Sequence, residues 1–206
     1  MPLDIDSQRL LALLHRYPQR ARLIKLVSQL ILPDGWVAAG MIRNLVWDHL
    51  HNQPLSPLND IDVIYFDADD TQGARALAAE TWLHQQAPDH NWQVRNQALM
   101  HARHGHAPYR DCGEAMGFWP ECETAVAVRW LATTAQWQVL APFGLHSLLA
   151  GKLTANPLRP AELFQQRLQH KGWLQRWPRL RLASPTEPTP SHPGIRHPWS
   201  PADGRE

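Results

Sequence analysis

The sequence lacks the features that mark secreted and membrane-spanning proteins. Its 206 residues include two cysteines, which is too few for the disulfide framework of a small secreted scaffold. No apolar run reaches the roughly 18 to 20 residues that span a bilayer. The N-terminus begins with acidic residues and has no apolar segment followed by a small-residue cleavage site. We therefore expect a cytoplasmic protein with no signal peptide and no membrane association.

A strong excess of one charge is also missing. The chain carries 20 Lys and Arg against 19 Asp and Glu, which gives a net charge of +1. A DNA-binding protein usually has a clear basic excess, so we expect no DNA binding, and the balance argues slightly against a long RNA partner.

The chain reads as one domain followed by a tail. Its length is that of a single domain, which we assign to residues 1–183. Residues 184–206 have a proline every few positions and almost nothing apolar to bury, so we expect a disordered tail. A proline-rich ligand for a partner domain is the alternative interpretation of this segment.

Hydrophobic spacing predicts alternating helices and short strands, hence an α/β (α+β) domain. Predicted helices cover residues 7–31 with a break at Pro18, 41–53, 74–86, 145–153 and 161–177. Predicted strands cover residues 35–40, 60–67, 91–97, 124–130 and part of 137–145. Residues 98–120 are predicted to be helical and then a loop.

The segment from residue 38 to residue 67 contains the pattern most informative about chemistry. Asp60 and Asp62 are two apart in a strand-prone run, so both carboxylates project from the same face of the strand. Two adjacent carboxylates repel each other, and a divalent cation is the usual compensation. Mg²⁺ is typically held by one or two carboxylates together with substrate phosphates. We therefore predict that Asp60 and Asp62 bind Mg²⁺ (or Mn²⁺).

A glycine turn upstream supplies a place for the phosphates. Gly40 opens a predicted helix, and a helix N-terminus presents free N–H groups and a positive dipole end. Arg43 in the first turn could add a guanidinium contact, and we place Asn44 with it. Each piece alone has an ordinary explanation as a capped strand end, a turn glycine or a surface charge. The combination favours metal-dependent nucleotide chemistry.

These residues, AGMIRN and DIDVIYFD, resemble the signature of nucleotidyltransferases of the DNA-polymerase-beta-like superfamily. The G-x-x-R from Gly40 to Arg43 is also similar to the head domain of CCA-adding enzymes and bacterial poly(A) polymerases. To about residue 182, the chain resembles a bacterial nucleotidyltransferase family through WQVRNQALMH, APYRD, WPECETAVAVR, APFGL and KGWLQRWPRL. The resemblance implies a small mixed sheet flanked by helices, and Mg²⁺-dependent transfer of a nucleoside monophosphate from an NTP.

One element of that pattern is missing from the expected place. The superfamily usually supplies a third carboxylate from a later strand, but NWQVRNQ contains no acid. We take Glu121 as the stand-in, and Asp89 and Glu123 are the other acids near these strands. A site with two carboxylates could also bind nucleotide without turning it over.

Several further polar residues could line the nucleotide or acceptor pocket. We assign Arg95, Asn96 and His101 to nucleotide binding, while an exposed strand edge or a strand end explains them equally well. Arg129 is either a phosphate contact or a solvated strand end.

The spacing of His101, His104, His106, Cys112 and Cys122 does not match the paired ligands of structural zinc sites. Trp173 and Trp177, four residues apart, indicate core packing.

The leading hypothesis is therefore a nucleotidyltransferase that releases pyrophosphate after attack of an acceptor hydroxyl on the α-phosphate. The acceptor is open: a small molecule, a protein side chain or an RNA end. The alternative is a nucleotide- or RNA-binding module that has lost the chemistry, and a third interpretation is an interaction protein that works through its tail.

Overall fold

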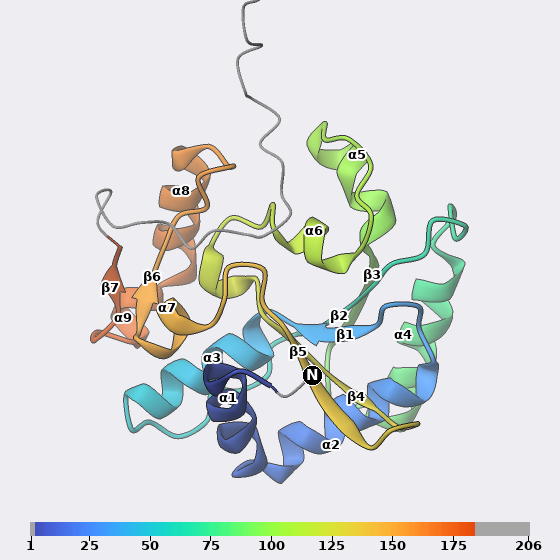
Figure 1. Ribbon diagram of the computed structural model, residues 1–206, viewed down its shortest axis with the longest axis horizontal. Coiled ribbons are helices and arrows are strands. Elements are labelled where there is room, and N and C mark those ends of the chain that lie inside the picture. Colours follow the sequence, from blue (N-terminus) through green and yellow to red (C-terminus); the bar gives the residue numbers. More distant parts are fainter. Residues whose placement is uncertain (1–2, 184–206) are drawn as a thin grey trace, which may run out of the picture.

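The computed structural model describes residues 3–183. The tail predicted for residues 184–206 therefore lies outside the described residues. Within them, a five-stranded sheet has the order β3-β2-β1-β4-β5, and helices lie on both of its faces (Figure 1). The strands are β1 (Trp36–Ala38), β2 (Ile61–Tyr65), β3 (Trp92–Asn96), β4 (Ala127–Leu131) and β5 (Gln136–Leu140).

The sheet is mixed, as predicted. β2 and β3 run parallel through a crossover that contains α4 (Ala74–Gln86), while β1 pairs antiparallel with both β2 and β4. β4 and β5 form an antiparallel hairpin. The parallel pair requires the long helical connection, because parallel strands cannot be joined by a tight turn.

One face of the sheet carries the larger core. Alternate strand residues such as Val37, Val63, Val94 and Val128 point to this face and are buried. They pack in one cluster with side chains of α1 (Ile5–His15), α2 (Pro18–Val27), α3 (Gly40–Leu50) and α4. In Figure 1, α1 and α2 lie below the sheet, α3 to its lower left and α4 to its right.

The opposite face carries a smaller core. Trp36, Ala38, Ile64 and Ala127 are buried there against residues that follow β3. These residues include Cys112 and Met116 of α6 (Cys112–Met116), Cys122 of the 3₁₀ helix η3 (Cys122–Thr124), and Phe143. Between β3 and α6 lie η2 (Gln97–Leu99) and α5 (Met100–His104). Asp62 is two residues before Ile64 on the same strand, so its carboxylate points to this smaller face.

The C-terminal part of the described chain closes over α3. It consists of α7 (His146–Leu149), β6 (Lys152–Leu153), α8 (Ala161–Lys171), α9 (Trp173–Arg176) and β7 (Arg181–Leu182). The ring centroids of Trp173 and Trp177 lie 5.8 and 5.1 Å from that of Trp47 in α3. All three rings are buried, which confirms the core role predicted for Trp173 and Trp177.

The sequence predictions fail where short elements depend on distant partners. Residues 145–153 are not one helix, because the positive φ of Gly151 ends α7 and Lys152 and Leu153 then pair with β7. Gly172, with φ of 59°, likewise separates α8 from α9 inside the helix predicted for residues 161–177. A two-residue strand and a five-residue helix such as α6 carry too little periodicity to be recognised.

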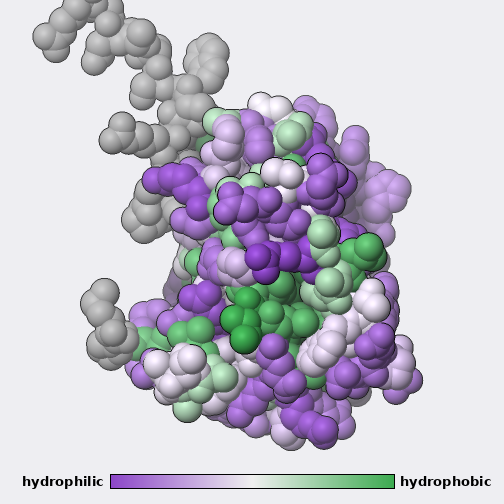
Figure 2. Space-filling model, turned by 90° about the vertical axis from the view of Figure 1, so that its right-hand side faces the viewer, coloured by the Kyte–Doolittle hydropathy of each residue, from purple (hydrophilic) through white to green (hydrophobic). Residues whose placement is uncertain are grey.

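No helix of the described residues is both long enough and apolar enough to cross a membrane. On the face shown in Figure 2, hydrophilic residues surround one hydrophobic patch near the middle.

Candidate active site

The register of two central strands places the predicted carboxylates beside the start of α3. Asp62 in β2 is paired with Ala38, the last residue of β1, and Asp60 directly precedes β2. Two residues after Ala38 the chain enters α3 at Gly40. The structure therefore brings together the D-x-D pair and the glycine turn, as the sequence pattern suggested.

The turn between β1 and α3 has an unusual backbone. Ala39 has φ of 55° and ψ of −124°, a conformation that costs a non-glycine residue of order 1 to 3 kcal/mol. Its N–H donates to the carbonyl of Val126 at 2.9 Å, and its carbonyl accepts from the N–H groups of Ile42 and Arg43. No side chain caps the helix, so α3 presents backbone N–H groups at the end that faces the carboxylates.

Gly40 keeps the space in front of the helix end open. A Cβ added there would meet the side chains of Arg43 and Asn44 at 3.9 Å, which is ordinary van der Waals contact. The protein itself therefore does not require glycine at this position. A ligand that approaches the backbone closely supplies a reason for it.

The surroundings of Asp62 destabilise its charge. Burial, and after it the negative charge of Asp60, raises the pKa of Asp62 from 3.8 to about 6. The positive charges of Arg43, Arg95 and Lys171 oppose this shift. The positive charges of the described residues therefore do not fully balance the negative charge at Asp62. A bound cation would be favoured at such a site.

Arg43 is a buried part of this site and not a surface charge. Its side chain donates to Thr124 Oγ1 at 2.7 Å and, through Nε and Nη2, to Asn44 Oδ1 at 3.2 and 2.9 Å. The guanidinium lies 4.8 and 4.7 Å from the ring centroids of Trp47 and Trp173. Burial lowers its pKa to about 10, and the carboxylates of Glu121, Asp62 and Asp60 oppose that change.

Glu121, the predicted third carboxylate, has a partner of its own. Its side chain is fully buried and forms a two-pronged ion pair with Arg167 of α8. On β3, the residue paired with Asp62 is Gln93. The described part of the chain contains no group of three or more His, Cys, Asp or Glu side chains placed to hold a metal ion.

Comparison with known proteins identifies the family. A family model described as "Nucleotidyltransferase" matches residues 25–182, which is most of the chain. The chain belongs to this nucleotidyltransferase family. The match spans β1, α3, β2 and the elements that follow up to β7.

Solved structures agree with the fold of this chain. An NMR structure that reveals a CCA-adding enzyme head domain has a TM-score of 0.74 and 30% identity, over 86% of this chain and 95% of that one. A CCA-adding enzyme in complex with CTP has a TM-score of 0.56 and 14% identity. A CCA-adding enzyme in apo form I has a TM-score of 0.55 and 14% identity.

The two CCA-adding enzymes are larger proteins. The two matches include 89% and 82% of this chain, but only 44% and 41% of the CCA-adding enzymes. At this identity the likeness concerns the fold alone. No match to the chain is found among curated proteins.

The remaining predicted nucleotide ligands lie in different surroundings. Arg95 shares the face of Asp62, close enough to lower its pKa, and pairs with Glu80 at 3.2 Å. Asn96 faces the other way and holds the loop after β2 through the backbone of Asp67, at 3.1 and 2.7 Å. His101, beyond the end of β3, contacts the carbonyl of its neighbour Ala98 at 2.7 Å. Of these three, only Arg95 is electrostatically coupled to the D-x-D pair.

Other candidates from the sequence are occupied elsewhere in the nucleotidyltransferase fold. Arg129 lies over the Trp36 ring at 3.9 Å and pairs with Asp34 at 3.3 Å. Cys112 and Cys122 are buried and free, and burial raises the pKa of both thiols. A thiol that resists ionisation is a poor metal ligand, because the thiolate is the form that binds metal.

Three residues that sequence reasoning missed contribute to the site. Thr124 fixes Arg43, Arg167 fixes Glu121, and Lys171 at the end of α8 lowers the pKa of Asp62. They lie 84 to 131 positions after Gly40 in the chain. Thr124 and Lys171 belong to segments that carry the family resemblance, but nothing in the local sequence indicates these contacts. The fold itself is what brings them near the carboxylates.

Proposed function

We propose that this chain is a Mg²⁺-dependent (or Mn²⁺-dependent) nucleotidyltransferase. It would transfer a nucleoside monophosphate from an NTP to an acceptor hydroxyl and release pyrophosphate. The observation that carries the proposal is the register of β1 and β2. That register sets Asp62 beside the turn into α3, so that carboxylates and an uncapped helix N-terminus face one another.

The donor groups at this point fit a hard divalent cation. Carboxylate oxygens are the ligands that Mg²⁺ prefers, together with phosphate oxygens of the substrate. Burial, and after it the charge of Asp60, raises the pKa of Asp62, and the nearby cations do not fully offset this rise. Asp60 and Asp62 would hold the metal, which when bound neutralises negative charge on the triphosphate.

The other residues of the site position the phosphates. The backbone N–H groups of Gly40 and Met41 offer hydrogen bonds to phosphate oxygens, because those of Ile42 and Arg43 already donate to the Ala39 carbonyl. Arg43 uses three hydrogen bonds to described partners, whereas a guanidinium has five N–H donors. Held by Thr124 and two indole rings, it is pre-organised to donate to a phosphate with little loss of conformational entropy.

A second candidate function is nucleotide binding without turnover. It is favoured by the absence of an acid beside the pair: Gln93 stands opposite Asp62 on β3, and Glu121 is bound to Arg167. The two candidates agree on where the nucleotide binds and differ in whether pyrophosphate is released.

Calorimetric titration with NTPs tests both candidates, and CTP is a reasonable first choice because a CCA-adding enzyme of this fold binds it. We expect binding that requires Mg²⁺ and is lost in Asp60→Asn/Asp62→Asn. The control Asp69→Asn/Glu162→Gln removes two exposed carboxylates and should bind like the wild type. Absence of binding by the folded wild type would refute both candidates.

A pyrophosphate-release assay with each NTP then separates them. Small-molecule, protein and RNA-end acceptors form the panel, because the site itself does not specify the acceptor. Release that Asp62→Asn abolishes supports the transferase. Metal-dependent binding without release across the panel supports the binding module.

A further inference from the structure

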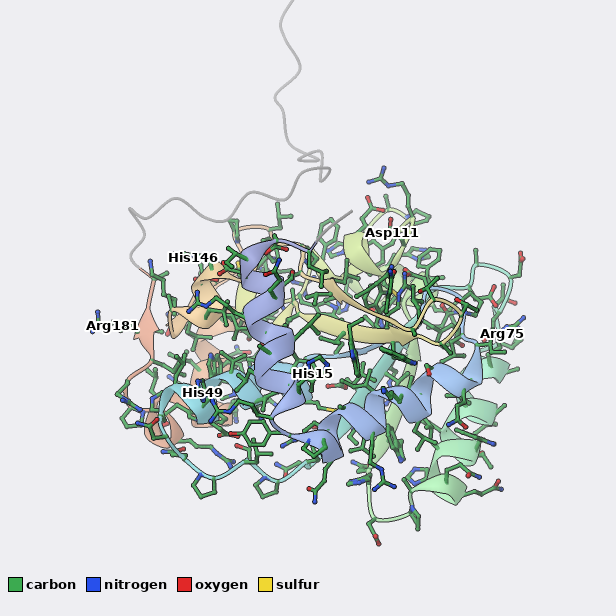
Figure 3. The ribbon with its side chains drawn as sticks, turned by 60° about the horizontal axis from the view of Figure 1, so that its bottom comes forward. His15, His49, Arg75, Asp111, His146 and Arg181 are labelled. Atoms are coloured by element: carbon green, nitrogen blue, oxygen red, sulfur yellow. The ribbon has the colours of Figure 1, made fainter. Side chains whose placement is uncertain are left out.

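A polar groove lies on the α2 side of the sheet, away from the D-x-D pair. It has a volume of about 800 Å³ and is lined by residues of α2, of the loop before β2, and of the segment between α4 and β3. Figure 3 shows α1 and α2 in front of the sheet, with α4 beyond the end of α2. Asp62 belongs to the opposite face of the sheet, so this groove is separate from the proposed active site.

The groove is rich in positive charge. Arg20, Arg22 and Lys25 of α2 line it together with His90, and Asp89 is the single acid in its lining. Arg22 and Lys25 are exposed, and no ion pair joins either of them to a carboxylate of a described residue. The ammonium of Lys25 lies over the Trp130 ring, 4.2 Å from its centroid, so Lys25 reaches the groove from the side of the β4–β5 hairpin. This concentration has a sequence basis, because residues 7–33 contain no Asp or Glu.

Arg20 gives the groove a buried cation with an unused donor. Its side chain is only 4% exposed, and its Nη2 donates to the carbonyl of Ser56 at 2.6 Å. Its Nη1 has no hydrogen-bond partner among the described residues. Buried polar groups in folded proteins are rarely left without a partner, so an unpaired guanidinium N–H beside a groove points to a ligand acceptor.

The nearest buried carboxylate does not supply that acceptor. Asp48 accepts from the backbone N–H and the hydroxyl of Ser56 at 2.6 and 2.7 Å, and from Trp177 Nε1 at 2.9 Å. Its charge acts on Arg20 only through space. The carboxylate of Asp48 therefore accepts its hydrogen bonds from Ser56 and Trp177, and none from Nη1 of Arg20.

We infer that this groove binds a phosphate-bearing ligand, with Arg20 at its base and Arg22 and Lys25 at its rim. Guanidinium and ammonium groups together suit phosphate oxygens, because charge-assisted hydrogen bonds are stronger than neutral ones. The phosphate can belong to a small molecule or to an RNA backbone, since both offer the same oxygens. The inference does not depend on the proposed transferase activity.

NMR titration of the full chain with inorganic pyrophosphate in the presence of EDTA tests the inference. We expect saturable shifts of backbone amides in α2 and in residues 55–58 and 86–90. Arg22→Gln/Lys25→Gln should weaken binding at least tenfold. The matched control Arg9→Gln/Arg16→Gln removes two exposed cations of the neighbouring segment and should stay within twofold of the wild type.

A second titration with a ten-nucleotide uridine RNA identifies the source of the phosphate. Tighter binding of RNA with shifts at the same amides assigns the groove to a polymer backbone, and binding of pyrophosphate alone assigns it to a small molecule. The inference is overturned if neither probe binds saturably, if the shifts lie only at the start of α3, or if the control pair weakens binding equally. Arg20→Met is a further variant, and the rim pair decides the question if that variant does not fold.

Discussion

At the scale of single residues, the D-x-D pair costs the protein stability. Asp62 is held where burial and Asp60 disfavour its charge, and its pKa rises from 3.8 to about 6. In the unfolded chain the same carboxyl ionises at its ordinary pKa. Residues kept in such an unfavourable state are typical of functional sites.

This cost predicts a pH dependence of folding. Below about pH 4 the carboxyl of Asp62 is protonated in both states and costs nothing. Between about pH 4 and 6 only the unfolded chain releases the proton, so the free energy of unfolding falls, and above pH 6 the penalty is constant. Without metal, Asp62→Asn should therefore gain about 1 to 3 kcal/mol relative to the wild type as pH rises from 4 to 7.

Urea unfolding with EDTA at several pH values measures this difference. Asp69→Asn, an exposed carboxylate in the loop after β2, is the control and should show no such gain. A constant difference between Asp62→Asn and the wild type from pH 4 to 7 would contradict the raised pKa.

At the scale of elements, α8 is attached to the site through one buried ion pair. Glu121 precedes η3 and is fully buried, and Arg167 on α8 reaches it while its own side chain stays 29% exposed. The next residues hold Arg43 through Thr124. This arrangement gives Glu121 a positioning role that differs from the third metal ligand predicted from the sequence, and that earlier role stays an untested prediction.

The two roles predict different results for Glu121→Gln. If Glu121 anchors α8, the variant should lose about 1 to 3 kcal/mol of stability, because Arg167 keeps a charge without a partner. The double variant Glu121→Leu/Arg167→Leu should recover much of that loss. Glu162→Gln, an exposed acid on the same helix, should change little.

Chemical denaturation of the wild type and these three variants measures the stabilities, and the pyrophosphate-release assay reports on catalysis. Unchanged stability of Glu121→Gln with complete loss of turnover would restore Glu121 as a metal ligand.

At the scale of the whole molecule, the C-terminal segment completes the core around α3. Trp173 and Trp177 pack edge-to-face on Trp47, and Trp177 donates to the buried carboxylate of Asp48. β7 then pairs with β6. Residues 161–182 are therefore part of the domain, and the family match extends to their end.

A chain that ends at Pro160 should not fold cooperatively. It would expose Trp47 and leave Asp48 with one donor fewer, and losing large buried aromatic contacts costs several kcal/mol of a typical stability of about 5 to 15 kcal/mol. A chain that ends at Ala183 keeps every described contact and serves as the control. Thermal unfolding followed by near-UV circular dichroism of the tryptophans compares the two, and a sharp transition of the shorter chain near that of the control would contradict this prediction.

The sequence by itself determined the local features of this protein. Its motifs resemble a nucleotidyltransferase family, and that resemblance implied the mixed sheet flanked by helices. Strand alternation and the strand–turn–helix unit, which act over a few residues, indicated that Asp60 and Asp62 share a site with Gly40. Only the tertiary structure decided which distant groups complete the site. Thr124, Arg167 and Lys171 reach it through packing of segments whose local sequence does not indicate these contacts, and Glu121 is engaged by a helix some 40 residues away. Long-range ion pairs and buried hydrogen bonds leave no periodic trace in a sequence, and for that reason the structure was needed to find them.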